Sequence, residues 1–89
     1  MIEYLRTKLG IPKLDGTEQS NRRYAHLFIQ KYKKEGIEPT KLFKEVVDIA
    51  SNTSNWWYGK TTKVADIYYN TAKILASKHF NKSKVAVIN

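Results

Sequence analysis

Apolar residues recur at helical spacing in four stretches of the chain, and residues that end helices separate them. The first stretch is short and predicts a helix over residues 2–9. Its apolar positions, three and four residues apart, are Ile2, Leu5 and Leu9. Gly10 is placed to end this helix and Pro12 forbids its continuation, so we expect residues 11–16 to form a loop.

The second stretch gives the clearest helical pattern. Thr17 can cap its start, and Gly36 can close its end in the left-handed conformation. The predicted apolar face consists of Tyr24, Leu27, Phe28 and Tyr32, with Ala25 and Ile29 on its flank. The opposite, polar side carries Arg22, Arg23, His26, Gln30, Lys33 and Lys34.

Two further helices are expected in the second half of the chain. The third begins at Glu38-Pro39-Thr40, because proline suits the first helical turn, and residues 51–55 end it by hydrogen-bonding locally. Its apolar positions are Leu42, Phe43, Val46, Val47, Ile49 and Ala50. The fourth is expected over about residues 63–78, with Thr61 and Thr62 as caps. Its buried side consists of Val64, Ile67, Tyr68, Thr71, Ile74 and Leu75.

No stretch sustains the alternating pattern of a strand, and the predicted loops are short. We therefore expect an all-α fold, a small bundle of three main helices plus a short N-terminal helix, as one domain over residues 1–89. Within it, residues 1–16 supply the short helix and loop. Residues 80–89 are expected to be a short extended piece or a frayed, flexible tail.

The net charge of the chain indicates which class of partner the protein binds. The chain has 16 Lys and Arg against 8 Asp and Glu, a net charge of +8. A polyanion is the usual partner of such a protein, because binding releases the counterions condensed on nucleic acid. An anionic membrane surface and an acidic protein are the alternatives.

The same composition excludes other classes. No apolar run approaches the roughly 20 residues that span a bilayer, so we expect no membrane insertion. The chain has no cysteine, which excludes a disulfide framework and a thiolate metal site and fits a cytoplasmic protein. His26 and His79 lie on different predicted helices without a carboxylate at a telling spacing. We expect these histidines to be solvated or partly packed, and we expect no enzyme, no metal and no cofactor.

The stretch over residues 56–63 is the most informative candidate site. Trp57 or Tyr58 can stack on unpaired bases, while Lys60 and Lys63 follow the backbone phosphates. In a domain this small one tryptophan usually fills the core. We expect Trp56 to do so and Trp57 to face solvent or a ligand.

Two more basic surfaces are candidates. One is the polar side of the second helix, where Arg22, Arg23, Lys33 and Lys34 can touch phosphates; the alternative is an ordinary solvated face. The other is the end of the chain, which has no acidic residue after Asp66; the alternative there is a solubilising tail. Its lysines are Lys73, Lys78, Lys82 and Lys84, with His79 among them.

Residues 21–29 (NRRYAHLFI) and residues 61–74 (TTKVADIYYNTAKI) together resemble a segment of phage and plasmid replication proteins, the replisome-organiser or DnaD-like proteins of low-GC Gram-positive bacteria. The resemblance covers roughly residues 20–76. It implies a C-terminal helical domain that binds DNA, especially single strands, and that contacts a replicative helicase, its loader or a primase. By position it assigns function to Tyr68, Tyr69, Asn70 and Lys73.

The sequence thus predicts a non-catalytic DNA-binding domain acting in replication of a phage, plasmid or other mobile element. The expected phosphate contacts are Arg22, Arg23, Lys33, Lys34, Lys60, Lys63 and Lys73, with Trp57, Tyr58 and Tyr69 as the aromatic contacts. The rival prediction is a protein-interaction module that docks on a host replication protein or inhibits a nucleic-acid enzyme.

Overall fold

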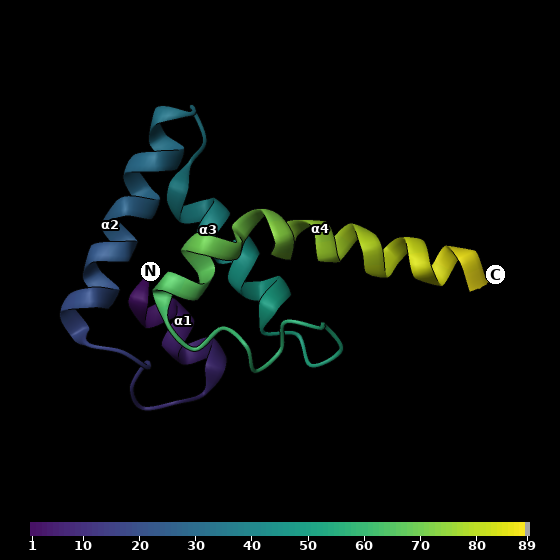
Figure 1. Cartoon of the computed structure of the whole chain (residues 1–89), viewed down its shortest axis with the longest axis horizontal. Helices are drawn as coiled ribbons and strands as arrows, with labels where there is room; N and C mark the ends of the chain where they lie inside the picture. Colours follow the sequence, from purple (N-terminus) through teal and green to yellow (C-terminus); the bar gives the residue numbers. More distant parts are fainter. Residues whose placement is uncertain (89) are drawn as a thin grey trace.

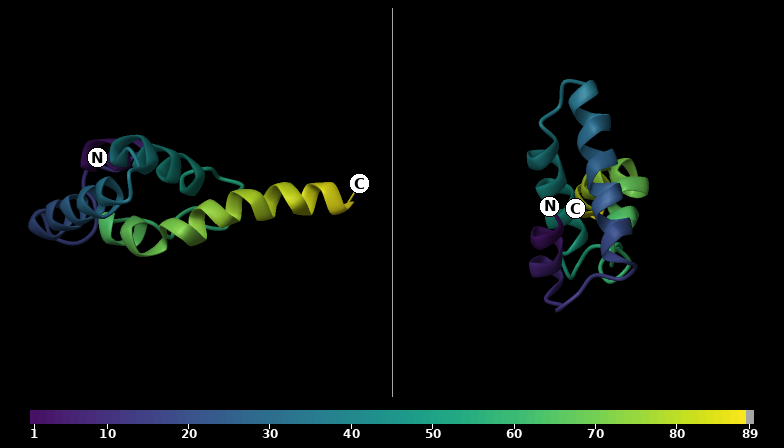
Figure 2. Two further views of the ribbon diagram at one scale, coloured as in Figure 1. Left: turned by 90° about the horizontal axis from the view of Figure 1, so that it is seen from above. Right: turned by 90° about the vertical axis from the view of Figure 1, so that its left-hand side faces the viewer.

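A computed structural model describes the backbone of residues 1–88 and the side chains of residues 1–77. The described backbone contains four helices and no strand, which confirms the predicted all-α fold (Figure 1). The helices are α1 (Ile2–Leu9), α2 (Glu18–Lys34), α3 (Pro39–Ala50) and α4 (Val64–Ile88). They form two layers, with α1 and α3 on one side and α2 and the first half of α4 on the other (Figure 2).

Helix α1 begins and ends where its pattern predicts. Gly10 follows it in the left-handed conformation, with a φ of 68°. The backbone N–H of Ile11 then donates to the carbonyl oxygen of Arg6 at 3.3 Å, which satisfies a carbonyl that the helix end would leave unpaired. Tyr4 fastens α1 to α3 because its hydroxyl donates to the Asp48 carboxylate.

Helix α2 has both of its predicted ends. The Thr17 hydroxyl accepts from the backbone N–H of Ser20 at 3.0 Å. At the other end Gly36 has a φ of 77°, and the N–H of Ile37 donates to the Tyr32 carbonyl at 2.9 Å. The buried side is rotated slightly from the expected one. Ala25, placed on the flank by the pattern, is buried, whereas Leu27 is half-buried.

The core lies where α2, α3 and α4 meet. The Phe28 and Phe43 rings pack edge to face, with centroids 5.2 Å apart and planes at 88°. Such a pair adds an electrostatic preference to the burial of both rings. The buried hydrophobic residues are Leu5, Leu14, Ala25, Phe28, Tyr32, Phe43, Val46, Val47, Ala50, Val64, Ile67 and Ile74.

A buried asparagine holds the start of α4. Asn21 of α2 is 5% exposed, and its Oδ1 accepts from the N–H of Val64 at 2.9 Å. Its Nδ2 donates to the carbonyl oxygens of Asp15 and Thr17. One side chain therefore ties the α1–α2 loop, α2 and α4 together. Thr61 and Thr62 were expected to cap α4, but the buried Thr61 Oγ1 has no hydrogen-bond partner, and Asn21 accepts from the first N–H of the helix instead.

The end of α4 differs from the expectation. The helix was predicted to stop near residue 78 and to be followed by an extended or frayed piece, but its backbone continues to Ile88. Nothing between Val64 and Ile88 breaks a helix, since this stretch contains neither glycine nor proline. The C-terminal part of α4 projects beyond the other helices (Figure 1). Among the described residues, no helix is long and apolar enough to cross a membrane.

Candidate nucleic-acid interface

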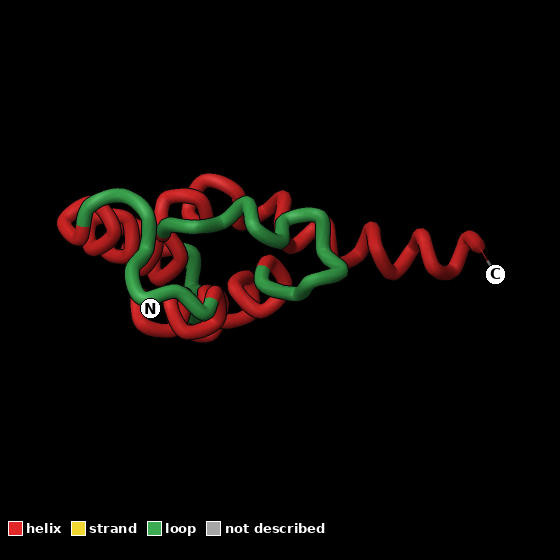
Figure 3. Tube along the Cα trace, turned by 90° about the horizontal axis from the view of Figure 1, so that it is seen from below, coloured by secondary structure: helices red, strands yellow, loops and turns green. Residues whose placement is uncertain are grey.

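The loop of residues 10–17 meets the loop of residues 51–63 near the start of α4, and we call the two loops together the loop end (Figure 3). The backbone N–H of Asp15 donates to the Thr62 carbonyl oxygen at 3.0 Å and joins the two loops. The Lys63 side chain lies close to Gly16. Its Cδ is 3.9 Å from the position that a β-carbon would occupy at Gly16. The loop end therefore combines residues that are far apart in sequence.

Trp56 is the most exposed aromatic side chain of the loop end. Its side chain is 65% exposed, and that of Tyr58 is 51% exposed. The ammonium of Lys60 lies over the Trp56 ring, with Nζ 4.4 Å from a ring centroid, and donates to the Trp56 carbonyl oxygen at 2.9 Å. This is a cation–π contact. The Trp56 ring, with Lys60 on one face and the Trp57 ring edge to face 5.0 Å away, still exposes surface on which a flat ligand can stack.

The two tryptophans exchange the roles expected from the sequence. Trp56 was expected in the core, but it faces solvent; Trp57 was expected to be exposed, but it is half-buried and packs against the core. The rings touch edge to face, with centroids 5.0 Å apart. The physical reason is that Asn55 is buried, so inward and outward positions alternate from Asn55 to Tyr58 and Trp56 points outward.

Three lysines of the loop end face solvent, and one of them, Lys60, contacts the Trp56 ring. Lys60 and Lys63 are exposed, as predicted. Lys13, in the neighbouring loop, is also exposed, and no sequence pattern pointed to it. It joins the loop end through the contact between Asp15 and Thr62.

The basic side of α2 does not form one surface with the loop end. Arg22, Arg23, Lys33 and Lys34 are all exposed, as predicted. However, the arginines lie near the start of α2 and the lysines near its end. Arg23 and Lys33 are ten positions apart, which is about 15 Å along the helix axis. Only the start of α2 adjoins the loop end (Figure 1). Arg22 is moreover ion-paired with Glu18.

A second aromatic surface lies on the seam between α2 and α4. The hydroxyls of Tyr24 and Tyr69 are 3.0 Å apart, and the Tyr24 ring also packs against Tyr68, with centroids 5.7 Å apart. Tyr69 is 66% exposed. Its hydrogen bond with Tyr24 raises the pKa of its phenol, and nearby Arg23 offsets part of that rise. Lys73 is exposed one helical turn beyond Tyr69.

The other residues assigned by resemblance or by charge are less available. Tyr68 is half-buried, and the Asn70 amide donates to the Asp66 carbonyl oxygen of its own helix at 2.8 Å. The side chains of Lys78, His79, Lys82 and Lys84 lie outside the described residues. Of the acid-free end, only Lys73 can therefore be placed.

Most of the positive charge in the described part faces solvent. Within residues 1–77, three ion pairs form: Arg6–Glu3, Lys8–Asp48 and Arg22–Glu18. Every other lysine and arginine in that range is exposed. The acidic residue nearest Lys63 in sequence, Asp66, accepts a hydrogen bond from the N–H of Thr62 at 3.0 Å at the start of α4.

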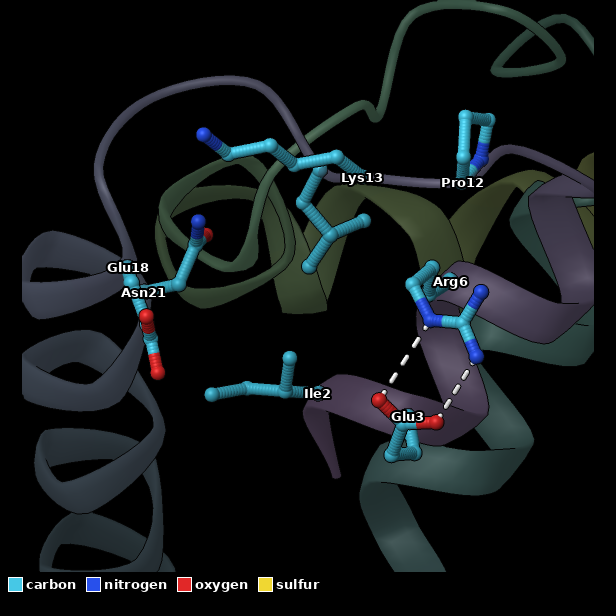
Figure 4. A pocket seen from close by; sticks show the side chains of 8 residues that line it. Ile2, Glu3, Arg6, Pro12, Lys13, Glu18 and Asn21 are labelled. Atoms are coloured by element: carbon cyan, nitrogen blue, oxygen red, sulfur yellow. Dashed lines mark hydrogen bonds and ion pairs between the residues drawn. The ribbon is translucent and has the colours of Figure 1, made fainter.

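A cavity of about 480 Å³ lies between α1, the α1–α2 loop and α2 (Figure 4). Arg6 on its wall is paired with Glu3 at 2.8 Å and also donates to the Ile11 carbonyl oxygen. Glu18 and Lys13 supply opposite charges at the rim. Because its charges offset one another, this cavity does not suit a phosphate. Within the described residues, no group of three His, Cys, Asp or Glu side chains is placed to hold a metal ion.

Comparisons of the chain with family models, with curated proteins and with solved structures gave no match. The resemblance to replisome-organiser or DnaD-like proteins therefore stays a prediction.

Proposed function

We propose that this protein is a non-catalytic nucleic-acid-binding domain whose principal contact is the loop end. One observation carries the proposal: the exposed Trp56 ring has the Lys60 ammonium on one face. A base can stack on the open face of the indole. A phosphate beside that base can then be contacted by Lys60, whose ammonium lies at the Trp56 ring.

The distribution of charge supports this mechanism. Lys13, Lys60 and Lys63 are exposed at the loop end. An unpaired cation neutralises a phosphate and releases a counterion, which makes binding favourable and salt-dependent. Arg23, Tyr69 and Lys73 supply a second group of contacts on the α2–α4 seam. A strand long enough to span both surfaces binds more tightly than a short one.

The biological setting that we propose comes from the resemblance. It assigns the domain to replication of a phage, plasmid or other mobile element, with DNA as the ligand. A replicative helicase, its loader or a primase is the protein partner in the same proposal. A cytoplasmic location follows from this role.

Fluorescence anisotropy with labelled single-stranded and double-stranded oligonucleotides, over a series of salt concentrations, tests the proposal. We expect affinity to fall as salt rises. Trp56→Ala should weaken binding about 5- to 150-fold, which corresponds to one stacked base. Lys60→Ala should reduce the salt dependence by the equivalent of about one phosphate.

The matched control is Lys41→Ala, which removes an equal charge from an exposed position in the first turn of α3, at the end of that helix opposite residues 51–63. It should change affinity much less than Lys60→Ala. Absence of binding at low salt, or an equal loss in the control, contradicts the proposal.

A protein-interaction module is the second candidate, and a separate surface favours it. Ile29 and Ile37 are 36% and 41% exposed, and they flank a hollow of about 480 Å³ at the C-terminal end of α2. Exposed apolar residues that gather in this way are typical of protein contacts. A partner that is captured after nuclease treatment, and lost on Ile37→Ser but retained on Trp56→Ala, would support this function instead.

A further inference from the structure

Asn55 is the centre of a hydrogen-bond network that shapes the loop bearing Trp56. The residue is 8% exposed. Its Oδ1 accepts from the backbone N–H of Trp57 at 2.7 Å, and its carbonyl oxygen accepts from the N–H of Tyr58 at 3.0 Å. Its own N–H donates to the Asn52 carbonyl oxygen at 2.9 Å. Asn55 thus fixes the chain on both sides of Trp56.

The network is anchored on α4 by one serine. Asn55 Nδ2 donates to Ser77 Oγ at 3.1 Å, across 22 residues of sequence. The Ser77 hydroxyl in turn donates to the carbonyl oxygen of Ile74, one turn earlier in α4, at 2.6 Å. Ser77 therefore accepts from the loop and donates to the helix. The Ser77 hydroxyl thus links the irregular turn around Asn55 to helix α4.

We propose that Asn55 and Ser77 form a clamp that positions Trp56 for contact with a base, an inference that rests on the proposed function. The clamp places neither side chain against the ligand, so both are positioning residues. Its effect is to hold the indole outward before the ligand arrives. A loop ordered in advance loses less conformational freedom on binding than a loop that must be ordered by its ligand.

The clamp also explains why Trp56 and not Trp57 faces solvent. With its amide turned inward to Ser77 and to the Trp57 N–H, Asn55 occupies the inner position of the turn. The Trp57 ring then packs against the core, and the Trp56 ring is directed outward beside Lys60. Loss of the anchor on α4 removes the contact that holds the Asn55 amide in this inner position.

Ser77→Ala tests this, because it removes the anchoring oxygen without changing charge. We expect affinity for a labelled single-stranded oligonucleotide to fall about 3- to 10-fold, as for a few side chains that must be ordered on binding. The salt dependence should stay unchanged. Ser77→Thr keeps the hydroxyl and should restore affinity, which separates loss of the hydrogen bond from loss of the fold.

A double-mutant cycle provides the readout that a purely structural role would not change. In a Trp56→Ala background, Ser77→Ala should cost no further affinity, since no ring remains to be positioned. An equal loss with and without Trp56 overturns the clamp as a positioning device, and so does wild-type affinity in the Ser77→Ala variant.

Near-ultraviolet and far-ultraviolet circular dichroism of the free protein tests the clamp without a ligand. The two indoles, 5.0 Å apart at 85°, should give a coupled signal that weakens in Ser77→Ala and returns in Ser77→Thr. If wild-type protein binds no oligonucleotide, the proposed function fails, while this signal still reports on the clamp. A signal unchanged in Ser77→Ala overturns the clamp itself.

Discussion

Replacing Asn21 by alanine should be among the most damaging single changes to this fold. The side chain is 5% exposed and makes three hydrogen bonds, to groups of the α1–α2 loop and of α4. One of them satisfies the N–H of Val64, the first residue of α4. Alanine supplies no partner for that buried donor.

The expected loss in the free energy of unfolding follows from which groups each broken hydrogen bond leaves without a partner. A buried donor without a partner costs about 1–3 kcal/mol, and an ordinary hydrogen bond contributes about 1 kcal/mol net. The Thr17 carbonyl keeps one bond, since it also accepts from the backbone N–H of Asn21 at 3.0 Å. The Asp15 carbonyl loses the bond from Asn21 Nδ2. We therefore expect a loss of about 3 kcal/mol in the free energy of unfolding, which in a domain this small lowers Tm by roughly 12–24 °C.

Urea unfolding followed by far-ultraviolet circular dichroism measures this loss. Asn70→Ala is the matched control, because the Asn70 amide makes one bond, to a carbonyl of its own helix. It should cost under about 1 kcal/mol. Asn21→Asp keeps the acceptor for Val64 and should fall between the two. A loss below about 1 kcal/mol for Asn21→Ala, or one equal to the control, would refute the role of Asn21 in tying the α1–α2 loop, α2 and α4 together.

Three further predictions test other parts of the structure. Trp57→Ala should cost about 2 kcal/mol by thermal unfolding because its ring packs against the core, and Trp56→Ala under about 0.5 kcal/mol; equal Tm values would contradict their assignment. Arg6 holds the pKa of Glu3 below its ordinary value of 4.5, so the ionised form is favoured in the folded state. The resulting stabilisation is present above that pH and is lost as the pH falls through the lowered pKa; urea midpoints of wild type and Glu3→Gln should converge in acid, and a constant difference would be inconsistent with this pairing. Gly36→Ala should cost about 1 kcal/mol in urea unfolding because φ is 77° there, and an unchanged midpoint would argue against the left-handed end of α2.

The helices could be predicted from the sequence because their signals are local. The stripe of α1, the Thr17 cap and the Gly36 terminator each act within a few residues, and the structure contains all three. The end of α4 could not be placed in this way. A helix without glycine or proline has no local stop signal, and the C-terminal part of α4 projects beyond the other helices, so packing against them does not mark its end either.

The candidate site was predictable only in composition. Exposed Lys60, Lys63 and Tyr58 were identified because polar loops expose their side chains. Lys13 was not, since its place depends on a backbone hydrogen bond between Asp15 and Thr62, which are distant in sequence. No residue type near Lys13 in the sequence predicts the hydrogen bond between Asp15 and Thr62.

The orientation of the tryptophans shows most directly why a loop resists prediction. In a helix or a strand, a fixed period decides which of two adjacent residues points inward. Residues 51–63 have no such period, so Trp56 and Trp57 are equivalent in pattern. A buried amide decides between them, and that amide is held by Ser77, on a different element. The outward indole is the feature on which the proposed function depends, and it is therefore a property of the tertiary fold. A loss of affinity in Ser77→Ala, a change at a residue that is neither basic nor aromatic, would distinguish a loop built to present Trp56 from a ring that is exposed by chance.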